Sequence, residues 1–370
     1  MRLEARNKIL NLYAPLLIVG VLAGCSSLVL EQDERPVSLT HTNFNSLPGW
    51  AHGDQGDALL PFWLSCQRLN RPANLNSHVS VRFGSMKLWR RSCRKLDTKK
   101  FGNHIYARKF FEKNFRAYLV TQKFSGKTEG LFTGYYEPQF DGSLKRFGEY
   151  QTPIYPAPDN LNQTTGRYFS RKQINNGALQ NYVEPIAWLK NPVDVFFLQI
   201  QGSGLIKLPN GEIVRVGYAG HNRHPYTSIG RVLINRQELS KEALSMQAIR
   251  SWLKNNPMKV IGLLELNARY IFFSLIKGSG PLGAQGVVLT PGRSLAIDPR
   301  FLTYGLPVWI DTKDPLNIDI AFQRLLISQD TGGAIRGAVR GDIFFGHGLS
   351  AAKRAGHMNR RGRYFVFLPK

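Results

Sequence analysis

The sequence has 370 residues, of which 43% are hydrophobic, so it can bury a sizeable core and is long enough for two domains. Lysine and arginine outnumber aspartate and glutamate by 49 to 25, a formal net charge of +24. The chain contains no internal repeat and no low-complexity segment, which excludes solenoid and fibrous architectures. The positive excess favours polyanionic partners, and a generally basic proteome is the alternative explanation.

The first 24 residues have the pattern of a signal peptide. A positively charged start is followed by a mostly apolar run over 9–22 and by the small residues Ala23 and Gly24. This run is too short and too interrupted to span a bilayer. Leu22-Ala-Gly-Cys25 resembles the cleavage site of bacterial lipoproteins, in which the cysteine receives the lipid. A signal peptide that happens to contain a cysteine is the alternative.

Lipidation of Cys25 would anchor the chain stably, because each buried methylene of an acyl chain contributes about 0.8 kcal/mol. Ser26 and Ser27 resemble the pattern that is sorted to the outer membrane. We therefore expect an outer-membrane lipoprotein whose body faces the periplasm and has no nucleic acid as a partner. The polyanions available there are anionic lipid head groups and cell-wall material that bears peptide carboxylates.

The N-terminal part of the chain combines a polar entry with one helical pattern. Residues 25–57 lack a long apolar period, and we interpret them as a tether with an irregular entry into the fold. The segment 109–120 places apolar residues at helical spacing, which predicts an amphipathic helix that packs in the core. These residues are Phe111, Phe115, Tyr118 and Leu119.

From residue 130 to about residue 234 the sequence changes to short β-like runs separated by Gly, Pro and Asn. Pro209-Asn-Gly211 between two apolar runs is a strong hairpin signal. The predicted strands include 131–136, 195–200 and 212–216.

Two helices and a second group of strands are predicted after residue 234. Ser240 is the expected N-cap of the first helix, and Asn256-Pro257 begins the second. Short strands with glycine-rich corners then predict a small closed barrel. These strands are 270–273, 295–297, 308–310, 325–327, 342–345 and 364–368.

Three aspartates stand at predicted strand ends or corners. Asp298 precedes Pro299 and Asp342 follows Gly341, and aspartate in such positions commonly bonds local backbone amides. Asp330 differs, because an apolar run leads to it and two glycines follow within three residues. Glycines let a ligand approach the backbone closely, and desolvation there would raise the pKa of the carboxyl group. A general acid at neutral pH needs such a shift.

Other chemistries fit the sequence less well. His221 and His224 lie close together but lack a third metal ligand nearby, so we predict no metal and no cofactor. Cys66 and Cys93 have no local signature of a nucleophile. In an oxidising compartment they could pair, or they could remain two buried thiols, and the sequence does not decide between these states.

Several longer motifs resemble the membrane-bound lytic murein transglycosylase A family, and the resemblance runs from about residue 110 to the C-terminus. The motifs are Gly130-Leu-Phe-Thr-Gly-Tyr-Tyr-Glu-Pro138, Phe197-Leu-Gln-Ile-Gln-Gly-Ser-Gly204, Gly217-Tyr-Ala-Gly-His-Asn222, Gly283-Ala-Gln-Gly286, Ala296-Ile-Asp-Pro-Arg300, Gln329-Asp-Thr-Gly-Gly-Ala-Ile335 and Gly341-Asp-Ile-Phe-Phe-Gly346. The resemblance implies a mainly β fold with helices, in which residues 58–135 and 264–370 form a double-psi β-barrel. A second, barrel-like β-domain over residues 136–263 is inserted between these parts, and a glycan groove lies between the two domains.

The resemblance also implies an activity. Asp330 falls on the family's single catalytic aspartate, and Asp298 and Asp342 fall on two supporting ones. The expected reaction cleaves the β-1,4 bond between N-acetylmuramic acid and N-acetylglucosamine in peptidoglycan, without water, and leaves 1,6-anhydromuramyl ends. The expected partners are glycan strands and possible members of a cell-wall synthesis complex.

Candidate glycan-binding residues come from the same motifs, and ordinary packing or turn formation explains each of them about as well. They are Thr133, Tyr135, Tyr136, Gln201, Gly202, Ser203 and Tyr218. A non-catalytic wall-binding lipoprotein on the same fold is the main alternative function. A hydrolase and an aspartic-type peptidase, the latter suggested by Asp330-Thr-Gly332, are two others.

Overall fold

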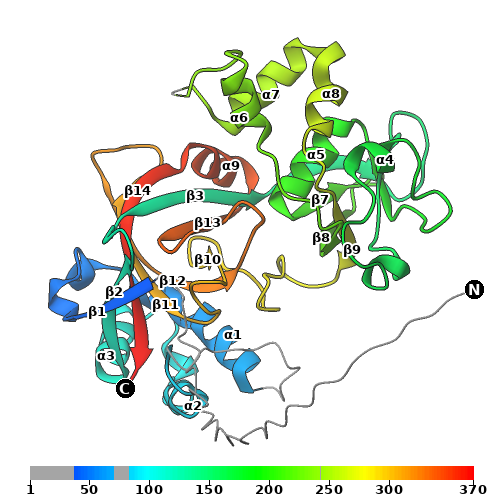
Figure 1. The fold of residues 1–370 in the computed structure, drawn as a ribbon. Helices are drawn as coiled ribbons and strands as arrows, with labels where there is room; N and C mark the ends of the chain where they lie inside the picture. Colours follow the sequence, from blue (N-terminus) through cyan, green and yellow to red (C-terminus); the bar gives the residue numbers. More distant parts are fainter. Residues whose placement is uncertain (1–36, 71–82, 242) are drawn as a thin grey trace, which may run out of the picture. The chain divides into compact units, whose positions relative to one another are not determined.

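A computed structural model of the chain describes residues 37–70, 83–241 and 243–370 (Figure 1). The expected signal peptide and Cys25 lie outside the described residues. Among the described residues, none of the helices combines the length and the apolar character that crossing a bilayer requires.

The larger sheet has eight strands in the order β1-β2-β14-β11-β12-β10-β13-β3. β14 also pairs with β3, so the pairings that start at β14 return to it through five other strands. The pairs β10–β12 and β13–β3 are parallel, and the others are antiparallel. The strands are β1 (Val37–Thr42), β2 (Phe115–Gln122), β3 (Gly130–Glu137), β10 (Ser294–Ala296), β11 (Pro307–Lys313), β12 (Ala321–Asp330), β13 (Arg340–His347) and β14 (Asn359–Pro369).

The second sheet has six strands in the order β5-β6-β4-β7-β8-β9, and all of them lie in the chain between β3 and β10. β7 and β8 form the hairpin predicted at 209–211, with Lys207 opposite Ile213. The strands are β4 (Gln139–Ser143), β5 (Thr152–Ile154), β6 (Ala187–Leu189), β7 (Ser203–Lys207), β8 (Ile213–His221) and β9 (Ile271–Ile276). Because β9 belongs to this sheet, the segment that builds it extends beyond the predicted boundary at residue 263.

Within the described ranges, three α-helices precede β2, five lie between β4 and β9, and one joins β13 to β14. A disulfide between Cys66 and Cys93 joins the first two helices, with 5.6 Å between the Cα atoms. The two cysteines are therefore paired in a disulfide and are not two buried thiols, the alternative that the sequence left open. The helices are α1 (Leu59–Asn70), α2 (Met86–Arg94), α3 (His104–Asn114), α4 (Arg171–Asn175), α5 (Pro192–Gln201), α6 (Ile229–Asn235), α7 (Met246–Asn255), α8 (Val260–Glu265) and α9 (Gly348–His357).

The tether predicted over 25–57 is wrong for residues 37–57. β1 pairs with β2 along its whole length, and Trp50 is only 2% exposed, with its ring centroid 5.1 Å from that of Trp309. The tether was predicted from the polar composition of this segment. β1 is an edge strand that pairs with one neighbour, and such a strand exposes alternate side chains to solvent and is therefore rich in polar residues.

The helix predicted over 109–120 is half correct. α3 ends at Asn114, and Phe115 to Gln122 form β2 between β1 and β14. Phe115, Ala117 and Val120 are buried, whereas Arg116 is exposed, a pattern closer to period two than to a helix. Residues 115–122 form a strand because they pair with β1 on one side and with β14 on the other, and both partners are remote in sequence.

The strand predicted at 195–200 is wrong, because this segment lies inside α5. Asn191 accepts a hydrogen bond from the backbone N–H of Asp194, and Pro192 occupies the first turn. Residues 195–199 are all buried, so the run lacks the periodicity that separates a strand from a buried helix.

The first helix after residue 234 begins later than predicted, because Ser245, rather than Ser240, caps α7. The second begins at Asn256-Pro257 as predicted, with a 3-10 turn over Pro257–Lys259 that leads into α8. The Asn256 side chain makes no capping bond and donates instead to the backbone oxygen of Trp252. α6 and α9 were not predicted. The six strands predicted from residue 270 onward are confirmed as β9 to β14.

Candidate active site

Asp330 is the last residue of β12, where its neighbour β10 also ends, and it is half-buried. Its Oδ2 accepts a hydrogen bond from the Tyr135 hydroxyl at 2.7 Å. Its Oδ1 accepts from the backbone N–H groups of Ala284 and Thr331 at 2.9 and 2.8 Å. Three donors from three segments therefore fix the orientation of this carboxyl group.

Burial raises the pKa of Asp330 from 3.8 to about 6. The three hydrogen bonds favour the carboxylate and oppose this shift, while the nearby charge of Asp342 adds to it. The desolvation effect is the largest, so both protonation states are populated near neutral pH. A group of this kind can donate a proton and then accept one.

A network of buried amides and hydroxyls lies beneath Asp330. The Gln329 amide accepts from the Ser294 hydroxyl at 2.6 Å and donates to Ser65 Oγ at 2.9 Å. Ser65 in turn donates to Gln285 Oε1 at 2.8 Å. The Gln285 backbone N–H donates to the Gln329 carbonyl at 2.9 Å, which places the neighbouring Ala284 N–H at the Asp330 carboxyl group.

Gly283 is required by this arrangement. A Cβ atom at this position would lie 2.5 Å from the carbonyl oxygen of Gln329 and 2.6 Å from Leu289. The loop that delivers the Ala284 N–H can therefore approach β12 only without a side chain at residue 283. The sequence pointed to the Gly283-Ala-Gln-Gly286 motif, but Ser65 is 265 positions from Asp330 and had no signal of its own.

Asp342 lies on β13 opposite Thr133 of β3. Thr133 Oγ1 donates to Asp342 Oδ1 at 2.5 Å, and Arg340 Nη2 donates to Thr133 Oγ1 at 2.8 Å. Burial raises the pKa of Asp342, although the Arg340 charge and the Thr133 hydrogen bond oppose the shift. The structure thus brings Thr133, Tyr135, Asp330 and Asp342 together.

Asp298 has a different environment. It is 1% exposed, its carboxyl group pairs with the Arg300 guanidinium at 2.6 Å, and it accepts from the Gly337 N–H at 2.9 Å. Burial alone would raise its pKa, but the hydrogen bonds from Arg300 and Gly337 hold it below its ordinary value. Asp298 therefore holds residues 298–300 against Gly337 through local bonds. Bonding of local backbone amides is the structural role that the sequence analysis considered for it.

The other predicted glycan-binding residues are Tyr136, Gln201, Gly202, Ser203 and Tyr218, and they differ in exposure and in hydrogen-bond partners. Gln201 Oε1 accepts from the backbone N–H of Tyr136 at 3.0 Å. Gly202 ends α5 with a φ of +80°, and the buried Ser203 begins β7. Tyr218 on β8 is 52% exposed, and its hydroxyl lies 2.7 Å from His221 Nδ1. Gln201 and Thr133 thus already have protein partners.

Two residues near Asp330 were not predicted. Arg269 packs on the Gly332-Gly333 turn, where a Cβ at Gly333 would lie 3.2 Å from the arginine Nε. Tyr304 bonds the Thr331 side chain, and burial followed by the Asp330 charge raises its pKa to about 12. Both stand outside the motifs, so nothing in their sequence context marked them.

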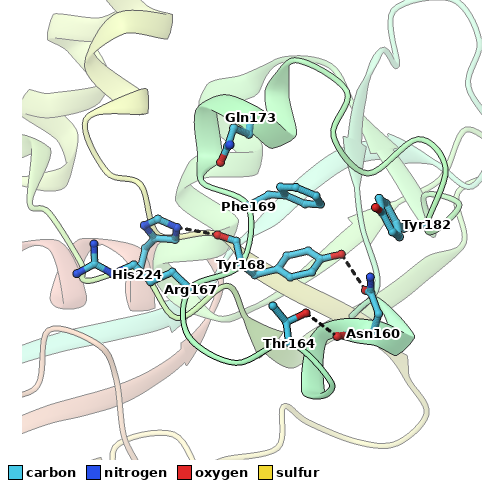
Figure 2. Close-up of a pocket in the computed structure, with 8 residues that line it drawn as sticks. All are labelled: Asn160, Thr164, Arg167, Tyr168, Phe169, Gln173, Tyr182 and His224. Carbon is cyan, nitrogen blue, oxygen red and sulfur yellow. Dashed lines mark hydrogen bonds between the residues drawn. The ribbon is translucent and has the colours of Figure 1, made fainter.

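A separate cavity of about 400 Å³ contains none of the predicted site residues. Figure 2 shows the Tyr168 hydroxyl bonded to Asn160 Oδ1, at 2.8 Å, and His224 Nε2 bonded to the Tyr168 carbonyl, also at 2.8 Å. The residues that line this cavity are Asn160, Thr164, Arg167, Tyr168, Phe169, Gln173, Tyr182 and His224. The candidate site at Asp330 is therefore defined by its chemistry and not by this cavity.

Comparison with family models gives two matches. Residues 131–274 match the MltA specific insert domain, and residues 293–368 match the 3D domain. The first range contains β4 to β8 of the second sheet and the first four residues of β9, and the second contains Asp298, Asp330 and Asp342.

Comparison with known proteins points the same way. The chain is 38% identical over 243 residues to membrane-bound lytic murein transglycosylase A of Escherichia coli strain K12, and this match spans 64% of each chain. A crystal structure of membrane-bound lytic murein transglycosylase from Agrobacterium tumefaciens superposes with a TM-score of 0.78 at 30% identity, covering 90% of this chain and 98% of that one. A crystal structure of E. coli MltA with bound chitohexaose gives a TM-score of 0.68 at 30% identity, covering 90% and 94%.

Proposed function

This chain belongs to the MltA family of lytic murein transglycosylases, and on that premise we propose that it cleaves the β-1,4 bond between N-acetylmuramic acid and N-acetylglucosamine in peptidoglycan without water. The observation that carries the proposal is the single half-buried carboxyl group of Asp330, with its pKa raised to about 6 and three fixed donors around it. Most glycosidases need a second carboxylate to activate water or attack the sugar. A reaction whose nucleophile belongs to the substrate needs only one.

In the first step, protonated Asp330 donates to the glycosidic oxygen, and the bond from that oxygen to C1 of the muramic sugar breaks. Oδ2 is the atom suited to carry the proton, because its partner, the Tyr135 hydroxyl, can rotate from donor to acceptor. Oδ1 faces two backbone N–H groups, which can only donate. Positive charge then develops on the muramic sugar.

In the second step, the Asp330 carboxylate accepts the proton of the C6 hydroxyl of the same sugar, and O6 bonds to C1. The product is a 1,6-anhydromuramyl end, and Asp330 is protonated again. Because the nucleophile is already part of the substrate, the entropic cost of bringing in a water molecule disappears.

The fold supports the proposed assignment of parts. We take the cyclic pairings of β14, β11, β12, β10, β13 and β3 to be the double-psi β-barrel, and the six-stranded sheet with its helices to be the inserted domain. Arg215 of β8 pairs with the buried Glu137 of β3 at 2.8 Å, a contact at the junction of these parts. The chitohexaose bound to the E. coli relative supports a glycan strand as the ligand. Tyr135, Tyr136 and Tyr218 are the side chains that we propose as its contacts, and Tyr218 is 52% exposed.

The proposed location follows from the N-terminal pattern. Curated relatives are called membrane-bound, and the chain carries a lipoprotein-like sequence at Cys25. We therefore place the protein as an outer-membrane lipoprotein that faces the periplasm. At that location, we propose a cell-wall synthesis complex as a partner of the protein.

The decisive experiment is digestion of purified sacculi with wild type and Asp330→Asn, followed by mass spectrometry of the fragments. Wild type should release 1,6-anhydromuramyl products with no oxygen from ¹⁸O-labelled water, and Asp330→Asn should release none while still binding sacculi. Reducing ends that carry ¹⁸O would instead identify a hydrolase. Binding by both proteins without any glycan release would favour the non-catalytic alternative.

A further inference from the structure

The surface of α2 and the turn after it carries a dense group of cations. Lys87, Arg90, Arg91, Arg94 and Lys95 recur at helical spacing, and Lys99 and Lys100 follow. All seven side chains are exposed, and Asp97 is the sole acidic residue between positions 87 and 100. Among the ion pairs of the described residues, none involves these seven, which we call the basic face.

The basic face is held rigidly to the body. The opposite side of α2 buries Trp89, whose indole N–H donates to the Phe83 carbonyl at 2.8 Å, and Cys93, which is bonded to α1. Lys95 Nζ also donates to Asn114 Oδ1 at 2.9 Å, at the end of α3. The cations are thus presented on a fixed surface, so binding through them costs little ordering of the backbone.

We propose that the basic face binds the phosphate head groups of anionic phospholipid at the membrane surface to which the chain is tethered. The proposal depends on the proposed anchor at Cys25. Between positions 85 and 100 no aromatic side chain is exposed, since the ring of Trp89 is buried. A row of cations without stacking groups fits a layer of phosphates better than a sugar or a particular peptide.

The dimensions of the chain allow anchor and basic face to meet one surface. Val37 pairs with Gln122 at one end of β2, and Lys95 lies beside Asn114 at the other. The seven residue steps from Phe115 to Gln122 span about 24 Å. Cys25 stands twelve positions before Val37, and twelve residues span at most about 40 Å when fully extended, which exceeds the length of β2.

The test uses a chain that starts at Ser26, which retains every described residue and all three hydrophobic cores but has no lipid. We expect it to sediment with vesicles containing about 30% phosphatidylglycerol in phosphatidylcholine, and not with pure phosphatidylcholine. The variant Arg90→Glu/Arg91→Glu/Arg94→Glu should bind the anionic vesicles more than about tenfold more weakly. Unfolding curves that match wild type would show that it is folded.

The matched control is Lys127→Glu/Lys254→Glu/Lys313→Glu, which changes the net charge equally at exposed sites outside the basic face. It should bind anionic vesicles within about twofold of wild type. Equal loss in both variants would overturn the proposal in favour of net charge alone. Loss of binding to sacculi with unchanged vesicle binding would overturn it in favour of a cell-wall ligand. Anhydro-product release by the basic-face variant on sacculi reports on the proposed activity separately.

Discussion

The Tyr135 hydroxyl donates a 2.7 Å hydrogen bond to Oδ2 of Asp330, although the two residues are 195 positions apart. β3 carries the tyrosine and β12 the aspartate, and the two strands are linked in the sheet through β10 and β13. Burial, followed by the charge and the hydrogen bond of Asp330, raises the pKa of Tyr135 well above its ordinary value, so it remains a neutral donor. This bond couples the protonation of the acid to a side chain that does not itself titrate near neutral pH.

Tyr135→Phe should shift the pH profile of product release. Its hydrogen bond lowers the pKa of Asp330, so its removal should raise that pKa above about 6 and move the alkaline limb of the kcat profile upward. Lost orientation of the carboxyl group should also reduce kcat about tenfold. The control is Tyr136→Phe, which should leave the midpoint unchanged. A reduced kcat with an unmoved midpoint would limit Tyr135 to a purely structural role.

Asp330→Asn should stabilise the folded protein at neutral pH while it abolishes activity. The folded-state pKa is raised from 3.8 to about 6, so the stability contributed by the protonated group is complete below about pH 4 and is lost as pH rises through about 6. An asparagine can accept the two backbone N–H bonds and donate to Tyr135 without a buried charge.

Urea unfolding at pH 7.5 and pH 4.0 measures this effect. Allowing for partial solvent exposure, we expect a gain of about 2 kcal/mol over wild type at the higher pH and almost none at the lower. An Asp330→Asn variant that is less stable than wild type at pH 7.5 would show that the charged carboxylate is not disfavoured in the fold.

Gly283→Ala should impair catalysis out of proportion to its size. The added Cβ must displace either the Gln329 carbonyl or the loop, which withdraws the Ala284 N–H from Asp330. We expect kcat to fall about a hundredfold and stability to fall by about 2 kcal/mol. Gly262→Ala is the control, because nothing lies within 4 Å of its Cβ position. Comparable loss of activity in both variants would contradict the proposed role of the loop.

Local patterns in the sequence were sufficient to predict the strands of the C-terminal region, and they singled out Asp330 as the candidate acid. Leu325, Leu326 and Ile327 are fully buried, and the two glycines after Asp330 leave room for a close approach. The same patterns located Asp298 and Asp342 at strand ends, and the family resemblance implied a supporting role for both. Their contrasting environments could not be read from sequence. Asp298 bonds a neighbouring arginine, whereas Asp342 bonds Thr133 from a strand 209 positions away.

The segments and site residues that were predicted wrongly or missed share a physical cause. β1 and β2 are strands because remote partners pair with them, and the apolar residues of α5 are buried on every side, which removes the helical period. Ser65 and Gln285 matter through hydrogen bonds between segments 220 positions apart. Interactions of this kind leave no trace within a local window of sequence.

The disulfide next to Ser65 has a consequence for the order of maturation. Cys66 closes its bond to Cys93 only where thiols become oxidised, and the preceding residue takes part in the amide network beneath the acid. In the reducing cytosol, α1 would be held only by packing and by hydrogen bonds such as those of Ser65. On the proposed periplasmic location, the covalent link beside the amide network under Asp330 forms only after secretion.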